Sequence, residues 1–357
     1  MRVIVIGAGI IGAAFAHALA RKGASVTVVE AARPAGGATA KSFGWINANY
    51  VQTPAYLRLR LDALEAWRRA APVIGPALRW GGSLAWEAGG AELQAQAEGI
   101  AAAGHEARLI GREEFARLEP DVADPPELCL HCPTEGAADP VAATEALLAA
   151  AVALGAERMV GCRALGFLTE GGLIAGVETD FGPLPADRVV VAAGVGSEAL
   201  LESAGVRLPM ENRVGLILHT RPLPPVLRHL VLTPEIHFRQ EADGRIVAGE
   251  LYSGGGAHEG MIDREPRALA ALMLETLRRR LPGVAGVEQG AVMLGLRPTP
   301  ADGLPILGPA RGAEGLYLAT THSGVTLAPL LGEIGAAEIV DGEEDARLAP
   351  FRLARFN

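Results

Sequence analysis

The chain opens with apolar runs separated by glycine-rich turns, a pattern that predicts a parallel β-α-β unit. Four consecutive apolar residues at 3–6 are typical of a strand buried on both faces. Strong helix formers follow at 13–21, and Gly23 ends that stretch. A second β-branched run at 25–30 completes the unit. We therefore expect a strand, a helix and a second strand parallel to the first.

Later segments predict elements with a different arrangement. Residues 235–239 and 244–249 are short β-rich runs on either side of an Ala-Asp-Gly turn, which is typical of an antiparallel hairpin. Residues 266–281 have the periodicity of an amphipathic helix that Pro-Gly ends. Residues 56–69 predict another helix with one apolar face, which we expect to face the core. This face comprises Leu57, Leu61, Leu64 and Trp67.

The turn after the first strand carries a glycine fingerprint for a dinucleotide. Gly7 permits a tight turn, Gly9 lets the backbone approach a pyrophosphate, and Gly12 lets the helix pack closely on the strand. The helix N-terminus then presents free N–H groups to the phosphates. Glu30 lies 18 positions after Gly12, where a carboxylate accepts hydrogen bonds from both ribose hydroxyls. A 2′-phosphate would meet like charge there, so the pattern disfavours NADP.

A loop of small residues at 33–47 favours FAD over NAD. The loop directly follows the ribose-binding strand, and its short side chains and free amides suit a segment that wraps a second phosphate and lies against a flat ring. An NAD enzyme would normally continue here into another strand and helix. An ordinary surface loop is the alternative interpretation.

Four segments in this order resemble the D-amino-acid oxidase/glycine oxidase superfamily of FAD-dependent oxidoreductases. They are the glycine turn with its loop, a strand and turn at 186–197, and the segments 295–308 and 316–329. The resemblance implies an α/β fold in which a Rossmann-like FAD-binding domain is interleaved with an α+β substrate domain built on an antiparallel sheet. The implied bounds are 1–72, 135–205 and 297–357 for the FAD-binding domain, and 73–134 and 206–296 for the substrate-binding domain.

The resemblance also implies how FAD is held. Sarcosine oxidases of the superfamily attach flavin through a cysteine just before the segment equivalent to 297–302, but Met293, Leu294 and Gly295 stand there in this chain. We therefore expect FAD to be non-covalent. The residues expected to bind it are Gly7, Ala8, Gly9, Ile11, Gly12, Glu30, Ala31, Thr39, Ala40, Lys41, Ser42, Gly44, Ala164, Ala193, Gly194, Ser323, Gly324, Val325 and Thr326.

Three residues are candidates for contact with substrate. Arg297 matches the family position that binds a substrate carboxylate, and guanidinium suits that task through two parallel hydrogen bonds. The alternative is a structural arginine that pairs with Asp302 or another acid. His237 is either a substrate contact or a satisfied strand histidine. His322 lies on the loop that resembles the flavin-edge loop, where it either contacts flavin or substrate or caps the turn.

The expected reaction is oxidation of a small amino acid or N-substituted glycine (D-amino acid, glycine or sarcosine type) by hydride transfer to flavin N5, giving an imine that water hydrolyses. A 2-hydroxy acid, which Arg297 would hold equally well, is one alternative. A flavin-binding subunit of a larger dehydrogenase is another, so homo- and hetero-oligomers both stay open.

Composition limits the partners and leaves the electron acceptor open. A net charge of −9 argues against nucleic acid, and no apolar run of membrane-spanning length occurs. Lys22 and Lys41 are the chain's two lysines. Oxidases of the superfamily use a lysine above the flavin to help oxygen react, but the comparable strand at 244–249 has none, so O2 and a quinone or other carrier both remain candidates.

Three cysteines are too few for a disulfide framework, which fits a cytoplasmic location, with peripheral contact to the inner membrane left open. Cys129 and Cys132 have CxxC spacing. No second CxxC or histidine cluster accompanies them in the sequence, so a metal site is not predicted.

Overall fold

A computed structural model describes residues 1–49, 52–250 and 265–356. Strands from the beginning, middle and end of the chain form a six-stranded sheet in the order β19-β20-β13-β1-β2-β9. Five of them run parallel, and the edge strand β19 is antiparallel to β20. The bounds are β1 Arg2–Ile6, β2 Ser25–Glu30, β9 Glu157–Val160, β13 Arg188–Val191, β19 Ile306–Pro309 and β20 Leu316–Thr320.

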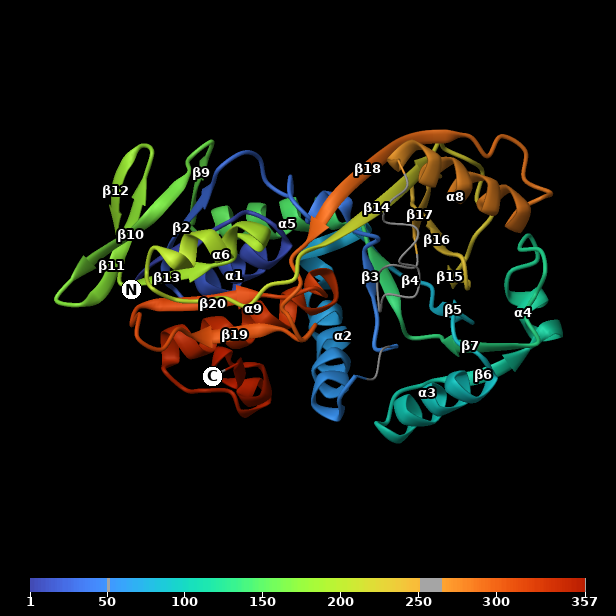
Figure 1. The fold of residues 1–357 in the computed structure, drawn as a ribbon, viewed down its shortest axis with the longest axis horizontal. Coiled ribbons are helices and arrows are strands. Elements are labelled where there is room, and N and C mark those ends of the chain that lie inside the picture. The colour runs from blue at the N-terminus through green and yellow to red at the C-terminus, as the bar shows by residue number, and fades with distance from the viewer. Residues whose placement is uncertain (50–51, 251–264, 357) are drawn as a thin grey trace.

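Both faces of this sheet are buried, as the continuous apolar run of β1 predicts. Val3 and Val5 pack into a cluster with the helices on one face, whereas Ile4 and Ile6 pack into a second cluster on the other face. The second face is covered by a small antiparallel sheet and a short helix (Figure 1). The helices of the first face are α1 Ile10–Arg21, α2 Pro54–Ile74, α5 Pro140–Ala153 and α9 Gly324–Asp341. The second face carries β10 Ala164–Glu170, β11 Leu173–Thr179, β12 Gly182–Pro185 and α6 Ser197–Glu202.

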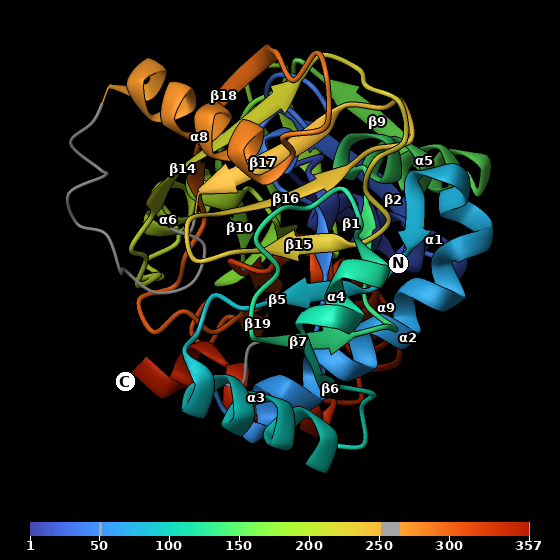
Figure 2. The ribbon, with the colours of Figure 1, turned by 90° about the vertical axis from the view of Figure 1, so that its right-hand side faces the viewer.

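An eight-stranded sheet forms the other lobe, in the order β18-β14-β17-β16-β15-β5-β7-β6. Its neighbours are antiparallel except for the pair β15 and β5. Figure 2 faces this lobe, with α8 beside β14 and β17, and α3 and α4 beside β6 and β7. The bounds are β5 Ser83–Ala85, β6 Arg108–Gly111, β7 Leu128–Cys132, β14 Arg213–Thr220, β15 Leu230–Leu232, β16 Ile236–Gln240, β17 Ile246–Glu250, β18 Gln289–Arg297, α3 Gly90–Ala102, α4 Arg112–Leu118 and α8 Pro266–Arg280.

The long strands β14 and β18 reach from this sheet toward the first lobe (Figure 1). They pair in antiparallel register, with Arg213 opposite Arg297 at the end nearest the first lobe. A third small sheet, in the order β3-β8-β4, joins β3 Trp45–Ile46, β8 Gly136–Ala138 and β4 Leu78–Trp80.

None of the described helices is long and apolar enough to cross a bilayer.

The α/β fold class and the expected elements are confirmed. The hairpin expected at 235–249 is β16 and β17, and the helix expected at 266–281 is α8. Helix α2 is longer at both ends than the predicted 56–69, because Thr53 caps its N-terminus and Gly75 ends it in a left-handed conformation. Three of the four residues expected on its apolar face are buried, and Leu61 is partly buried.

The domain bounds remain a prediction. Helix α2 continues past the expected boundary at residue 72, and β4, from the expected substrate domain, pairs with β8 from the expected FAD-binding domain. Residues 251–264 of the expected substrate domain lie outside the described residues.

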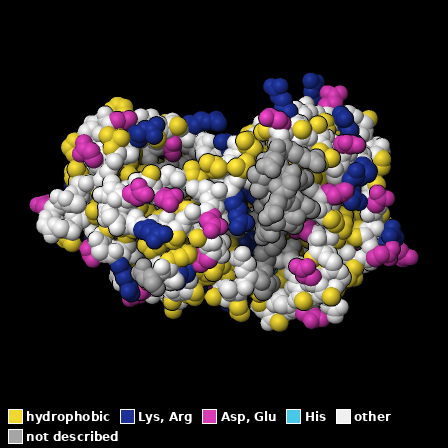
Figure 3. Space-filling model, viewed as in Figure 1, with side chains coloured by type: hydrophobic (Ala, Val, Ile, Leu, Met, Phe, Trp, Pro, Cys, Tyr) yellow, Lys and Arg dark blue, Asp and Glu magenta, His cyan; other side chains and the backbone are white. Residues whose placement is uncertain are grey.

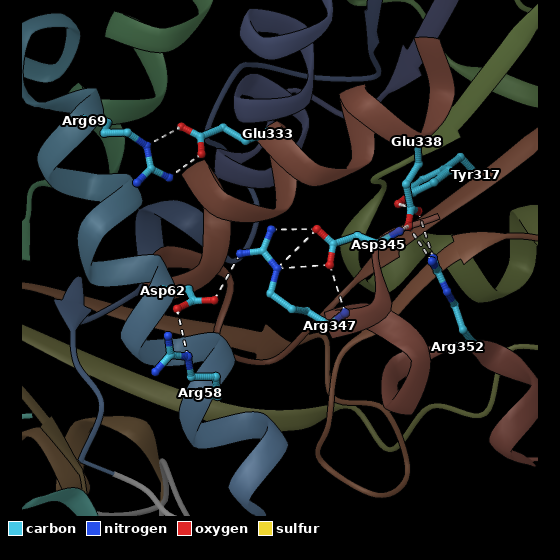
Figure 4. Close-up of polar contacts among 9 residues, drawn as sticks. All are labelled: Arg58, Asp62, Arg69, Tyr317, Glu333, Glu338, Asp345, Arg347 and Arg352. Atoms are coloured by element: carbon cyan, nitrogen blue, oxygen red, sulfur yellow. Dashed lines mark hydrogen bonds and ion pairs between the residues drawn. The ribbon is translucent and has the colours of Figure 1, made fainter. Parts of the chain in front are cut away.

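Ion pairs fasten the C-terminal segment to α2 and α9 (Figure 4). Arg347, in a short 3₁₀ helix (Ala346–Phe351), donates to Asp62 of α2 at 3.0 Å. Arg352 pairs with Glu338 of α9, which also accepts from the Tyr317 hydroxyl at 2.6 Å. The exposed pairs stabilise little individually. Together they connect the C-terminal segment to two helices whose N-terminal ends reach the site described below.

We predict that Gly12→Ala destabilises the protein by about 1–3 kcal/mol or more, since overpacking a core has costs of this order. A Cβ at Gly12 would lie 1.8 Å from the carbonyl oxygen of Gly7, so α1 would have to move away from β1. Thermal unfolding measures the effect. Gly90→Ala is the control, because a Cβ at Gly90 meets nothing within 4 Å. Equal melting temperatures for the two variants would contradict the close packing.

Candidate active site

The glycine turn leaves an open cradle at the N-terminus of α1. Gly7 has a φ of 101°, and a Cβ there would lie 2.5 Å from the carbonyl oxygen of Ala192. The nearest atom to a Cβ at Gly9 is the Thr39 hydroxyl at 3.2 Å. The N–H groups of the first turn of α1, including Ile11 and Gly12, have no acceptor within the helix. The cradle therefore offers backbone donors and positive helix-end potential to a phosphate group.

Glu30 ends β2 beside this cradle. Its carboxylate accepts hydrogen bonds from the backbone N–H of Ala8 at 2.9 Å and of Ala32 at 2.8 Å. These bonds also fix the position of Ala31 between Glu30 and Ala32. A carboxylate has about four acceptor positions, so Glu30 keeps capacity for a pair of ribose hydroxyls.

The other residues expected to bind cofactor surround the cradle. The Thr39 hydroxyl accepts from the Ile10 N–H at 3.1 Å. Ala193, followed by Gly194, packs against Gly7, since a Cβ at Gly7 would lie 3.1 Å from its Cα. Ala40 donates its N–H to the Ala35 carbonyl at 3.0 Å, which closes the loop after β2. Ala164 begins β10, two residues after Cys162 donates its N–H to the Glu30 carbonyl at 3.0 Å.

A cavity of about 410 Å³ lies between this loop, α2, the eight-stranded sheet and the N-terminus of α9. One edge of the cavity lies close to the cradle, since a Cβ at Gly324, at the start of α9, would lie 3.6–3.9 Å from the side chains of Ile10 and Ile11. All three candidate substrate contacts line the cavity, along with seven residues expected to bind cofactor. These are His237, Arg297 and His322, with Lys41, Ser42, Gly44, Ser323, Gly324, Val325 and Thr326.

Three glycines of the eight-stranded sheet make room for long polar side chains on its cavity side. A Cβ at Gly215 would lie 2.4 Å from Nε of Arg297, and a Cβ at Gly249 would lie 2.1 Å from Nε2 of His237. A Cβ at Gly295 would lie 2.6 Å from Cδ of Lys41. We call Gly215, Gly249 and Gly295 the glycine floor. Side chains at these positions would push the functional groups out of place.

Both cavity histidines are held neutral. Burial, followed by the charges of Arg297 and Arg239, lowers the pKa of His237 to about 3. Burial, followed by the charges of Arg297, Arg60 and Arg213, lowers the pKa of His322 to about 4. The His237 ring also packs edge-on against Phe43, with ring centroids 4.3 Å apart. Each imidazole therefore carries no charge at neutral pH.

The N-terminus of α9 is tied to α2 by residues that sequence reasoning missed. Tyr56 and Arg60 both donate to the Ser323 hydroxyl at 2.9 Å. Arg60 is buried and also donates to the backbone carbonyl of Asn47 at 3.1 Å and to its side-chain oxygen. Tyr56 and Arg60 are polar groups at helical i, i+4 spacing in a largely apolar helix, and this signal in the sequence could have marked them.

Positive charge is concentrated in the cavity although the chain carries −9 overall. Lys41, Arg60, Arg213 and Arg297 line it. Asp302 lines it too, but its carboxylate accepts from the Arg355 guanidinium at 2.7 and 2.9 Å. On the face seen in Figure 3, by contrast, basic and acidic side chains are scattered among each other. The cavity is thus suited to an anionic ligand.

The model of the DAO family, described as FAD dependent oxidoreductase, matches residues 2–338. The chain belongs to this family. The open glycine cradle, Glu30 and the helix N-termini of α1 and α9 fit its cofactor, because they supply donors for phosphates and an acceptor for ribose. Non-covalent attachment of FAD stays a prediction.

Relatives of this DAO-family chain include amino-acid oxidases and dehydrogenases. It is 34% identical to glycine oxidase from Pseudomonas putida over 50% of each chain. It is 29% identical to D-amino acid dehydrogenase from Rhizobium rhizogenes over 90% of this chain and 91% of that one. The match with the glycine oxidase thus spans about half the length of that relative. The crystal structure of L-proline dehydrogenase from P. horikoshii, 24% identical, superposes over 99% of this chain and 97% of that one with a TM-score of 0.88.

In this DAO-family chain a buried carboxylate lies behind the cofactor loop. Glu135 is fully buried and accepts from the Ser83 hydroxyl at 2.6 Å, the Ala48 N–H at 2.7 Å and the Trp45 indole at 3.0 Å. Burial raises its pKa to about 7, against the opposing effect of these hydrogen bonds. Glu135 therefore fixes the end of the loop to β5.

The cysteines of the chain do not form a disulfide. Cys129, Cys132 and Cys162 are buried free thiols, and burial raises the pKa of Cys129 and Cys132. Among the described residues, no group of three or more histidine, cysteine or acidic side chains could hold a metal.

We predict that Glu135→Gln changes how stability depends on pH. A carboxyl group with a folded pKa of about 7 and an unfolded value near 4.5 stabilises the fold below pH 4.5, and this contribution is lost as the pH rises to 7. Relative to the variant, the wild type should lose about 3 kcal/mol across this window. Denaturant unfolding at a series of pH values measures the difference. Glu127→Gln, at an exposed position, is the control, and parallel curves for wild type and Glu135→Gln would contradict the raised pKa.

Proposed function

We propose that the protein oxidises a small amine that bears a carboxylate, an amino acid or an N-substituted glycine, with FAD as its cofactor. The observation that carries this proposal is the placement of Arg297, whose guanidinium lies over Gly215 on the cavity side of the sheet. A guanidinium in this position can bind a carboxylate through two parallel hydrogen bonds. Such binding orients the substrate, which provides much of the rate enhancement in this type of chemistry.

The residues that would hold FAD extend from the cradle to the cavity. The α1 N-terminus would receive the phosphates, Glu30 the ribose, and the loop at 39–44 with the α9 N-terminus the flavin end. Bound FAD supplies the acceptor for the hydride that the substrate loses. Lys41 lines the cavity, and its side chain lies against Gly295. A lysine is therefore present near the expected flavin end of the site, although the sequence of β17 contains none.

The cavity favours the reactive, neutral form of the substrate amine. Amine oxidation removes a hydride from the carbon and a proton from the nitrogen, leaving an imine that water hydrolyses. After burial, the charges of Arg297 and Arg60 do most to lower the pKa of His322, and they would act in the same direction on a bound ammonium group. His237 and His322, with pKa values of about 3 and 4, are weak bases that can still hydrogen-bond the amine. The proton therefore leaves to solvent.

The residues of the cavity and the composition of the chain bear on the electron acceptor and the cellular location. O2 and a quinone or other carrier both remain compatible with the residues that line the cavity. The composition, with three cysteines, favours a cytoplasmic location, with or without contact to the inner membrane.

Anaerobic mixing of the purified yellow protein with glycine, sarcosine and a panel of amino acids tests the proposal. We expect at least one amine to bleach the flavin absorbance, and readmission of air then reports whether O2 accepts the electrons. Bleaching by 2-hydroxy acids but not by their amino analogues would select the alternative reaction. No bleaching by any amine would contradict the proposal.

We predict that Arg297→Ala weakens binding of carboxylate substrates by at least about 2 kcal/mol, the scale of a lost charged hydrogen-bond pair. The concentration dependence of anaerobic flavin reduction measures it. Arg297→Lys keeps the charge but loses the bidentate geometry, so it should recover only part of the loss. Unchanged kinetics in Arg297→Ala would remove Arg297 from the site.

A further inference from the structure

Resting on the proposed function, the structure assigns the cavity a second carboxylate subsite, formed by Arg213. We propose that the preferred substrate is an amine bearing two carboxylates, one bound by Arg297 and the other by Arg213. The second carboxylate would belong either to the side chain of an acidic amino acid or to an N-carboxyalkyl group. Both sources present the same chemistry to Arg213.

Strand register brings the two arginines together. Arg213 of β14 is directly opposite Arg297 of β18 in an antiparallel pair. Directly opposed residues project to the same face of a sheet, with Cβ atoms about 4.5–5.5 Å apart. Both line the cavity, as does Ile217, which lies on the same face of β14 as Arg213. Val214 and Leu296, one position along, project to the other face and are exposed there.

A pair of opposed like charges is unfavourable unless something neutralises it. Within the described part of the chain, Arg213 forms an ion pair with Glu211, a long contact of 4.0 Å to a side chain that is 61% exposed. Such a pair contributes little. An anion between the two guanidinium groups would relieve the repulsion, and a substrate with one carboxylate bound at Arg297 would leave the charge of Arg213 facing the cavity.

Exposure distinguishes the tasks of the two arginines. The Arg297 guanidinium lies against the glycine floor, whereas the Arg213 side chain lines the cavity and is 49% exposed to solvent. Arg297 is therefore suited to fix the carboxylate nearest the reacting carbon. Arg213 is suited to bind a carboxylate at the outer end of the same molecule. This arrangement makes Arg213 a specificity-determining residue.

Matched substrate pairs test the inference with the FAD-loaded enzyme. Sarcosine and iminodiacetate differ by a carboxylate on the N-substituent, and 2-aminobutyrate and glutamate differ by a carboxylate on the side chain, with both enantiomers used. We expect the dicarboxylate of at least one pair to reduce the flavin anaerobically with a second-order rate constant at least tenfold above that of its partner. The pair that shows this effect identifies the source of the second carboxylate.

The variant Arg213→Gln should remove this preference, lowering the rate constant for the dicarboxylate at least tenfold and that for its partner less than threefold. Arg221→Gln is the matched control, since Arg221 is 71% exposed and follows the other end of β14. Binding of succinate and butyrate, followed by perturbation of the flavin spectrum, gives a readout without turnover and should show the same selective loss. Melting curves check that both variants fold.

Three results overturn the inference, and they distinguish failure of the second subsite from failure of the proposed function. If amines reduce the flavin but no dicarboxylate exceeds its partner, or if Arg213→Gln affects both members of a pair equally, the second subsite is wrong and the proposed function stands. If no amine of any kind reduces the flavin, the proposed function fails and the second subsite fails with it.

Discussion

The site depends on three long polar side chains that lie very close to the backbone of the eight-stranded sheet. They can do so because the sheet has glycine at the positions beneath them. Arg297, His237 and Lys41 lie over Gly215, Gly249 and Gly295, at separations that a Cβ would not allow. The cavity exists because these side chains lie flat against the sheet instead of filling the space above it. The same device operates in the cradle, where Gly7 and Gly12 let β1, β13 and α1 converge. The cavity and the cradle therefore depend on the same physical constraint, which is the absence of a Cβ atom where two parts of the chain come into contact.

The glycine floor has an electrostatic consequence. Above it lies a half-enclosed space lined by the guanidinium groups of Arg60, Arg213 and Arg297, whose charges are screened less than on the surface. The acidic chain thereby acquires a local positive potential that attracts an anionic substrate. Burial, followed by this positive charge, keeps His237 and His322 neutral. The α9 N-terminus adds a partial positive charge at one end of the cavity. Ion pairs connect α2, α9 and the C-terminal segment beside the cavity (Figure 4).

The sequence was sufficient for the features that depend on local pattern. The sequence predicted the glycine turn, Glu30 and the β16–β17 hairpin. Each can be recognised from residues that lie within about 30 positions of one another in the chain. Arg213 was missed because only the register of β14 against β18 places it opposite Arg297. Arg60 was missed because it shares α2 with the apolar residues that dominate the pattern, and Glu135 because its three partners come from distant segments. The roles of these three residues depend on contacts between segments that are far apart in the sequence. The local hydrophobic periodicity of a segment does not predict such contacts.

The central claim is that the glycine floor positions Arg297 as the carboxylate anchor. The affinity of the FAD-loaded protein for a simple carboxylate such as acetate, followed in the flavin spectrum, tests it directly when wild type is compared with Gly215→Ala. The added Cβ would meet the mobile end of the Arg297 side chain at 2.4–2.7 Å, so the guanidinium should move while the fold and FAD content stay unchanged. The account predicts at least tenfold weaker binding in a variant that melts normally. Unchanged affinity in that variant would contradict it.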